Sequence, residues 1–310
     1  MGQRKNYMSK RKVITLAVED SFSSLKRIEE FKSKFQSPRY TIELIKIKNT
    51  FIESGKSTKK NIQNRQAFIE HLNEKVLESD ADGAVHSFVN FPNDFPNDLI
   101  VAAVNRKDIV GDVIVSQNKT NISEIPDTIV IGTNNVRNNN QLSLIRNDLS
   151  HELLTDSSFT QLLDWYSSNK KEKALIVSHD DFIFSESPNN FNFSRLPIRH
   201  FTPAPGQGSI AIVTLDENKP SKLIHASLDN PRARVETMIE HIVFSNMTPK
   251  NSANAGIHAI VRGEYVHVTV QLFGKKPDEY IRTYRDLPIR TYAESAKEFS
   301  KELNKMAKKK

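Results

Sequence analysis

Cysteine is absent from this chain of 310 residues. The absence excludes disulfide bonds, thiolate metal sites and cysteine nucleophiles. Long apolar runs are absent too, so the sequence holds no candidate for a membrane-spanning helix. The basic N-terminal segment MGQRKNYMSKRK is followed by neither an apolar signal core nor a small-residue cleavage site. We therefore expect a disordered leader on a cytoplasmic protein.

Common sequence motifs of nucleotide-binding and hydrolytic proteins are also missing. Gly206-Gln207-Gly208 lacks the third glycine of a dinucleotide loop, and there is no P-loop and no G-x-S-x-G elbow. The nine histidines do not have the spacing of metal ligands. His179-Asp180-Asp181 follows a predicted strand and could pair a base with carboxylates, but a solvated strand end is the favoured interpretation.

The chain is basic, with a formal net charge of +7. Part of the excess lies in the N-terminal segment and in the terminal KMAKKK, where no nucleic-acid recognition motif accompanies it. We expect solvated tails and neither a nucleic-acid nor a membrane partner. A hydrophobic content of 37% and a charged content of 26% are typical of globular proteins, and the length allows two or three domains.

Strand and helix patterns alternate along the chain, which indicates α/β layers. A polar loop is expected at 50–64, a return connection at 185–205 and a linker at 220–222. The predicted strands are 13–18, 40–47, 83–87, 99–104, 128–135, 173–178, 209–215, 257–261 and 265–272. The predicted helices are 22–35, 67–77, one ending at Leu144, 159–167, 231–246 and one beginning at Tyr292.

Polar clusters follow three of these strands, at His86-Ser87, Thr133-Asn134-Asn135 and Pro205–Gly208. In open α/β sheets, ligands lie outside the carboxyl ends of strands, where helix N-termini supply free N–H groups. Arg65 and Arg137 adjoin these segments and could hold carboxylates as bidentate forks. The pattern indicates an anion-binding cleft between two α/β domains, although the first two clusters are equally typical of helix N-caps.

Five segments carry a more specific signal. Their order and spacing, from about residue 12 to 305, resemble those of the porphobilinogen deaminase (hydroxymethylbilane synthase) family. The five are RQAFIEHLNEKVL (65–77), ADGAVHSFVNFPNDFP (81–96), IGTNNVRNNNQL (131–142), PAPGQGSIAIV (203–213) and NPRARVETMIEHIVFSNM (230–247) with its following loop.

The resemblance implies two type II periplasmic-binding-protein-like α/β domains and a third, small α/β domain. It places domain 1 at 11–112 and 200–217, domain 2 at 113–199, and domain 3 at 220–310. The family enzyme condenses four porphobilinogens and releases ammonia at each step. It builds the product on a dipyrromethane cofactor tethered to a cysteine of domain 3. One aspartate stabilises the positive intermediates, and arginines and lysines bind the acetate and propionate groups.

This chain departs from the family pattern at the chemical positions. Asn90 stands at the family aspartate, and a neutral amide cannot stabilise developing positive charge as a carboxylate does. Ala253 stands at the family cysteine, so no thioether can form. Further positions where the family has a basic residue are Glu19, Asn61, Val89, Asn138, Thr155 and Gln161. The scaffold signals remain, among them Phe68, His86-Ser87, Gly132-Thr133 and Gly206-Gln207-Gly208.

The sequence therefore predicts a family member without the standard synthase activity and without dipyrromethane. A retained interdomain cleft is expected to bind a small anion or a porphobilinogen-like molecule, in a protein expected to be monomeric. The expected binding residues are Arg65, Ser87, Thr133, Asn134, Arg137 and Gly206. Two alternatives stay open. One is an active hydroxymethylbilane synthase that has re-sited its cofactor and acid; the other is a plain ligand-binding module, which would not need the third domain.

Overall fold

The computed structural model describes residues 11–51, 58–92, 95–117, 121–154, 159–168, 172–186, 188–216, 218–252, 254–274 and 279–308. The side chains of residues 58–62, 90, 251 and 252 are not part of that description. Residues 1–10 of the expected leader, and Ala253, lie outside it. None of the described helices combines the length and the apolar character needed to cross a membrane.

The first sheet has the strand order β2-β1-β3-β10-β4, and β10 runs antiparallel to both neighbours. Helices cover both faces. Leu16 of β1 packs with Phe31 of α1 and Ile224 of α6, whereas Ala17, which points to the other face, packs with Phe68 of α2. The elements are β1 (Lys12–Glu19), α1 (Phe22–Lys32), β2 (Tyr40–Ile47), α2 (Thr58–Leu77), β3 (Gly83–Ser87), β4 (Leu99–Val104), β10 (Ile210–Leu215) and α6 (Lys219–Leu228).

The second sheet repeats this plan in the order β7-β6-β8-β5-β9, with β5 antiparallel to both neighbours. Leu142 of α3 packs on one face, and Leu162 of α4 and Phe182 of α5 pack on the other. The elements are β5 (Asp112–Ser116), β6 (Val130–Thr133), α3 (Val136–Ile145), β7 (Ser150–Leu153), α4 (Phe159–Ser167), β8 (Lys173–Ser178), α5 (His179–Ile183) and β9 (Asn192–Arg195).

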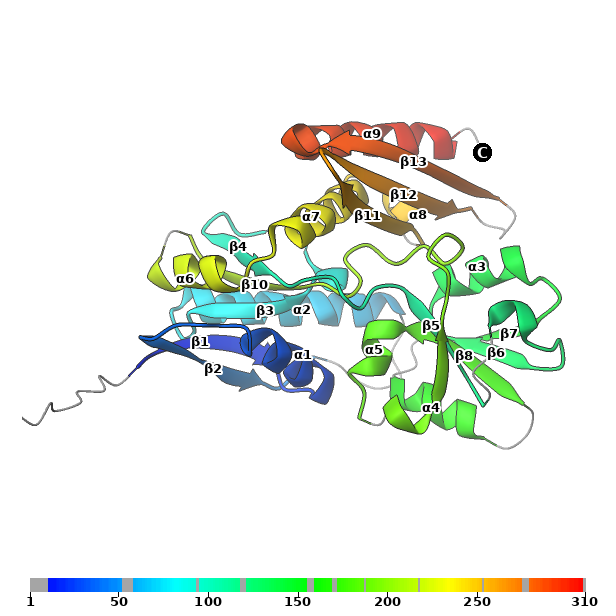
Figure 1. The fold of residues 1–310 in the computed structure, drawn as a ribbon, viewed down its shortest axis with the longest axis horizontal. Helices are drawn as coiled ribbons and strands as arrows, with labels where there is room; N and C mark the ends of the chain where they lie inside the picture. Colours follow the sequence, from blue (N-terminus) through cyan, green and yellow to red (C-terminus); the bar gives the residue numbers. More distant parts are fainter. Residues whose placement is uncertain are drawn as a thin grey trace, which may run out of the picture.

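The chain crosses from the first sheet to the second between β4 and β5, and it returns between β9 and β10 (Figure 1). Strands β10 and β5 occupy equivalent positions in the two orders. The predicted fold class is confirmed: the protein is α/β, with two mixed five-stranded sheets that resemble those of periplasmic-binding-protein domains and a small third sheet.

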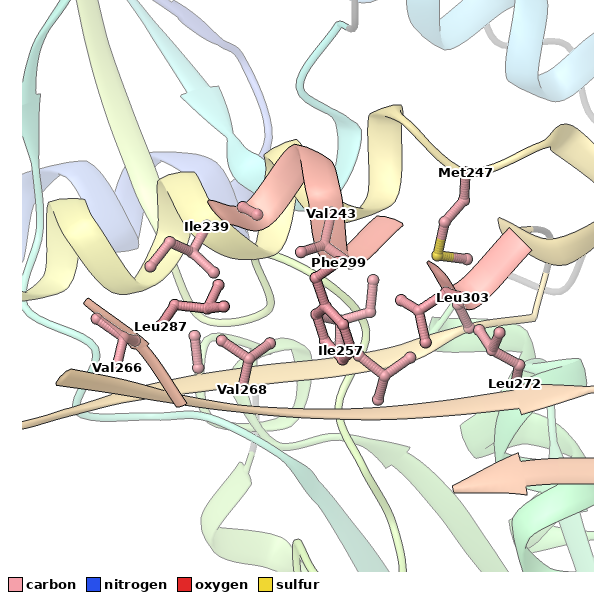
Figure 2. Packing of buried hydrophobic residues seen from close by; sticks show 14 of the residues in the cluster. Ile239, Val243, Met247, Ile257, Val266, Val268, Leu272, Leu287, Phe299 and Leu303 are labelled. Atoms are coloured by element: carbon pink, nitrogen blue, oxygen red, sulfur yellow. The ribbon is translucent and has the colours of Figure 1, made fainter. Parts of the chain in front are cut away.

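The third sheet is antiparallel, in the order β11-β12-β13 (Figure 1), and helices α7 and α9 pack in one apolar core with it. Figure 2 shows Ile239 and Val243 of α7, and Phe299 and Leu303 of α9, gathered over Val268 of β12. Asn230 caps α7 by accepting from the Ala233 N–H at 2.9 Å. The elements are α7 (Pro231–Ser245), α8 (Pro249–Ser252), β11 (Gly256–Arg262), β12 (Tyr265–Phe273), β13 (Tyr280–Pro288) and α9 (Tyr292–Lys308).

Two connecting segments differ from their prediction. Residues 58–64 belong to the loop expected at 50–64, but they form the start of α2. These residues are polar and have no apolar stripe, so the sequence gives no signal for a helix there. The expected linker at 220–222 lies in the first turns of α6, because the side chain of Asn218 caps this helix and proline fits a helix start. Strands β5, β7, β9 and β13 had no predicted counterpart, and β7 and β9 are edge strands of four residues each.

The domain limits themselves stay a prediction. Helix α6 bears on where the third domain would begin, because Ile224 and Leu228 pack in the core of the first sheet. The third sheet and its helices form a separate apolar core, which includes residues from Val235 onward. A limit after Leu228 would fit this packing better than the predicted limit at 220.

Candidate functional site

A cleft of about 400 Å³ lies between the first two sheets. Its walls include the carboxyl ends of β1, β3 and β8 and the start of α3, which contribute Glu19, Ser87, Ser178 and Arg137. Parallel strands place their carboxyl ends at one edge of a sheet, so the two sheets present matching edges to the same space. This is the place at which the sequence predicts a cleft.

Arg137 lines the cleft, but its guanidinium group is already bound. Nη1 lies 2.9 Å from Asp112 Oδ2 and donates to the Thr202 carbonyl oxygen at 2.6 Å, while Nη2 donates to Asp112 Oδ1 at 3.2 Å. Arg137 is 3% exposed and Asp112 is 2% exposed. A buried, bidentate partner matches the arginine charge, so Arg137 adds no free positive charge to the cleft.

Gln207 extends this pair into a network. Its Nε2 donates to the Gly111 carbonyl oxygen at 2.6 Å, to Asp112 Oδ1 at 3.1 Å and to Ser178 Oγ at 3.2 Å. The loop around Gln207 thus fastens the return crossing onto the second sheet. Asp112 has no signal in the sequence that pairs it with Arg137, because 25 residues separate the two.

Gly206 is not among the residues that line the cleft; it lies in the segment through which the chain returns from the second sheet to the first. Its φ of +73° is a conformation that favours glycine, and an added Cβ would lie 2.8 Å from Phe88 Cβ. Its N–H donates to Glu240 Oε2 at 2.8 Å. Lys107 Nζ lies 2.6 Å from Glu240 Oε1. Burial opposes ionisation of Glu240, yet Lys107 and His258 hold its pKa below the ordinary value. The contacts of Glu240 thus join α7, which packs on the third sheet, to the loop that contains Gly206.

The other predicted residues either line the cleft or belong to turns next to it. Ser87 and the exposed Asn134 line the cleft. Thr133 is fully buried, and its Oγ1 accepts from the Asn135 N–H at 3.2 Å, as part of the turn that starts α3. Asn135 caps α3 by accepting from the Arg137 N–H at 2.9 Å. The N-cap interpretation therefore describes this turn. Asn90 lies in a 3₁₀ turn over Phe88–Asn90.

Arg65 lies on α2, is exposed, and lines the cleft. Among the residues that the structure describes, no carboxylate forms an ion pair with it. Arg65 is therefore a cation that lines the cleft and has no ion-pair partner among the described acids.

Two acids that line the cleft, Asp180 and Glu19, are not among the predicted binding residues. Asp180 Oδ2 lies 2.8 Å from Arg27 Nη2, which also lies 2.7 Å from Asp181 Oδ1. These ion pairs link α1, which packs on the first sheet, to α5, which packs on the second sheet. Burial raises the pKa of Asp180 to about 7, against the opposing effect of Arg27. His179 is 2% exposed and the side chain of Asp180 is 13% exposed, so a solvated strand end is the wrong interpretation of these two residues; the side chain of Asp181 is 59% exposed, as that interpretation expected.

Glu19 occupies the cleft at the end of β1, where the resemblance placed a basic residue. Its Oε1 accepts from Asn49 Nδ2 at 2.9 Å and its Oε2 from Ser24 Oγ at 3.1 Å. Together with Asp112, Asp180 and Asp181, Glu19 makes four carboxylates against the three guanidinium groups of Arg27, Arg65 and Arg137. The cleft thus has one more acid than base.

His86 borders the cleft as a neutral side chain. Its Nε2 lies 2.9 Å from Asn73 Oδ1, and burial lowers its pKa to about 4. Because Nε2 donates to the amide oxygen, Nδ1 carries the lone pair and can only accept.

Solved structures to which this chain is similar include a YaeC-family lipoprotein of Enterococcus faecalis (13% identical, TM-score 0.38, covering 72% of this chain and 93% of that chain). Substrate-binding domain 2 of GlnP of Lactococcus lactis is 11% identical, with a TM-score of 0.40, and the match covers 70% of this chain and 88% of that chain.

Sequence relatives are more specific. A probable porphobilinogen deaminase of Methanococcoides burtonii is 27% identical over 236 residues, which cover 74% of this chain and 73% of the relative. Another, of Halobacterium salinarum, is 21% identical, and the match covers 94% of this chain and 95% of the relative. A family model described as porphobilinogen deaminase, dipyromethane cofactor binding domain, matches residues 14–222. The chain therefore belongs to the porphobilinogen deaminase family.

Proposed function

We propose that this family member does not carry out hydroxymethylbilane synthesis on a tethered dipyrromethane, and that it uses its interdomain cleft to bind a small molecule. The observation that carries the proposal is the complete absence of cysteine. The family cofactor is attached to a cysteine, so it cannot be attached to this chain in the usual way.

The cleft chemistry does not fit dipyrromethane either. That cofactor carries several carboxylates, which need unpaired cations. Here Asp112 occupies Arg137, Asp180 and Asp181 occupy Arg27, and Glu19 adds a further negative charge. A polycarboxylate would meet repulsion from these acids in a partly desolvated space, where charges interact more strongly than in water.

The scaffold around the cleft supports retained ligand binding. Gln207 and the Asp112–Arg137 pair hold the crossing segments in place through buried hydrogen bonds. Arg65 supplies one cation for a small anion or a porphobilinogen-like molecule. A charge-assisted hydrogen bond contributes about 1.5–3 kcal/mol, so one arginine and a few N–H groups fit roughly millimolar to micromolar binding.

The alternative is an active hydroxymethylbilane synthase. It is favoured by the names of the relatives, one of which matches over 95% of its length. Such an enzyme would have to hold its primer without a thioether and stabilise positive intermediates without the family aspartate.

Turnover separates the two. The purified chain is incubated with porphobilinogen, and ammonia release and porphobilinogen consumption are followed, with the Methanococcoides burtonii relative as positive control. We expect no release above the rate without protein. Sustained release of one ammonia per porphobilinogen consumed would overturn the proposal.

Binding is measured in parallel by calorimetry with phosphate and porphobilinogen, and with citrate as a polycarboxylate that the acids of the cleft should repel. The native chain is compared with Arg65→Ala and with Arg39→Ala, which removes an exposed arginine outside the cleft. We expect saturable binding of phosphate or porphobilinogen that Arg65→Ala weakens at least tenfold and Arg39→Ala leaves unchanged, and no binding of citrate. Equal binding by both variants would remove Arg65 from the site.

A further inference from the structure

Three buried acceptor atoms at the cleft have no hydrogen-bond partner among the described residues. They are Nδ1 of His86, Oδ1 of Asn138 and Oδ1 of Asp180, and all three residues line the cleft. His86 and Asn138 are 3% and 1% exposed. Buried polar atoms are nearly always partnered in folded proteins, so three unpartnered acceptors on residues that line one cleft suit a ligand that donates hydrogen bonds.

Glu19 adds a charge to these acceptors. Its carboxylate is held by the neutral donors Asn49 and Ser24, and no cation among the described residues pairs with it. Neutral donors fix the orientation of a carboxylate and leave its charge in place. The same cleft therefore holds a negative charge and residues with unpartnered acceptors, a combination suited to a cationic donor.

A metal ion does not fit these groups. No cluster of three or more His, Asp or Glu side chains with the arrangement of metal ligands occurs among the described residues. A primary ammonium group fits better, because it carries one positive charge and three N–H donors. It can bind a carboxylate and two neutral acceptors at once.

The cleft also has vacant donors. Nε of Arg27 and Nε of Arg137 are buried without a partner among the described residues. Arg65 brings a charge that no described acid matches. A ligand that satisfies both sets must carry an acceptor with negative charge as well as a donor with positive charge.

We propose that the cleft binds a small ω-amino acid, whose primary ammonium group is received by Glu19 and Asp180 and whose single carboxylate pairs with Arg65. The inference rests on the proposed function, because it names the ligand class of the same cleft. It specifies a zwitterion in place of a simple anion, which matches the near balance of acids and bases on the cleft wall.

The test compares molecules of one size that differ in charge. Calorimetry is run with γ-aminobutyrate, with butyrate, which lacks the amine, and with butylamine, which lacks the carboxylate. Glycine, β-alanine and 6-aminohexanoate vary the distance between the charges. We expect at least one ω-amino acid to bind ten or more times tighter than butyrate and butylamine.

Variants assign the two ends of the ligand. Glu19→Gln and Asp180→Asn should each weaken binding of that amino acid at least tenfold and change butyrate binding less than twofold. Arg65→Ala should weaken the amino acid and leave butylamine unchanged. Glu43→Gln, at an exposed position on β2 outside the cleft, is the matched control and should change nothing. Thermal unfolding of each variant establishes that it is folded.

Two results would overturn the inference. One is that butyrate binds as tightly as every amino acid of the series, which would leave a plain anion site. The other is that no amino acid of the series binds at millimolar concentration. Neither result bears on turnover: the proposed function fails on ammonia release from porphobilinogen, and the ligand class fails on this series.

Discussion

Arg137 and Asp112 form a bidentate ion pair that is buried where the chain crosses between the two five-stranded sheets. Nη1 lies 2.9 Å from Oδ2, and Nη2 donates to Oδ1 at 3.2 Å. Arg137, which the sequence had suggested for anion binding, is therefore held in a structural ion pair. Removal of either partner leaves the other as an uncompensated buried charge.

We therefore predict that Arg137→Ala lowers the free energy of unfolding by about 3–5 kcal/mol. Chemical denaturation measures the loss. Arg106→Ala is the control, since Arg106 pairs with Asp108 on the surface at 72% exposure, and such pairs contribute only about 0–1 kcal/mol. A loss no larger than that of the control would mean that Arg137 is not held by Asp112 in solution.

Asp180 is predicted to make stability depend on pH. Its pKa is raised by burial to about 7, from an ordinary value of 3.8. Between these values the folded protein keeps a proton that the unfolded chain releases. The stabilisation is therefore complete below about pH 4 and is lost as the pH rises to about 7.

Asp180→Asn cannot titrate, so the stability of the native chain minus that of the variant should fall from about pH 4 to pH 7 and then stay level. Denaturant unfolding at several pH values measures this difference. Asp181→Asn is the control, because the side chain of Asp181 is 59% exposed. A difference for Asp180→Asn that does not change with pH would contradict the raised pKa.

Gly208 is predicted to be intolerant of any side chain. Its φ is +78°, and an added Cβ would lie 2.0 Å from the Ile109 carbonyl oxygen. Gly263 has a φ of +61° but nothing within 4 Å of the added atom, so Gly263→Ala measures backbone strain alone. Gly208→Ala should cost about 1–3 kcal/mol more than Gly263→Ala. Equal losses in thermal or denaturant unfolding would show that the crossing loop can move aside.

Asn90→Asp is predicted not to create synthase activity. The substitution restores the family carboxylate but neither a thiol nor the cations that bind product carboxylates. Formation of uroporphyrinogen from porphobilinogen by this single variant, measured by absorbance after oxidation, would contradict the prediction. The native chain serves as its control.

The apolar runs of the sequence predicted the interior of the fold well. The strands at 40–47, 83–87, 99–104 and 173–178 have the predicted bounds, because buried strands need continuous apolar or alternating residues. The short edge strands β7 and β9 bury little, and so their sequences carry no such pattern. The first turns of α2 also lack an apolar stripe in the sequence.

The position of the cleft could be predicted from the sequence, but which of its arginines are paired with acids could not. Strand ends and glycine loops mark where ligands bind in α/β folds, and these features survive in this chain. No local pattern reveals that Asp112 lies against Arg137, or that Arg27 of α1 reaches Asp180 of α5. Such pairs join residues distant in sequence, and only the folded arrangement decides whether an arginine is free for a ligand.

We expect that no dipyrromethane is attached to this chain, because the chain has no cysteine. Mass spectrometry of the intact, full-length protein tests it most directly, after purification and again after incubation with porphobilinogen, with the Methanococcoides burtonii relative treated alike. We expect the mass of the bare polypeptide in both samples of this chain. A covalent addition of the mass of dipyrromethane, in either sample, would contradict it.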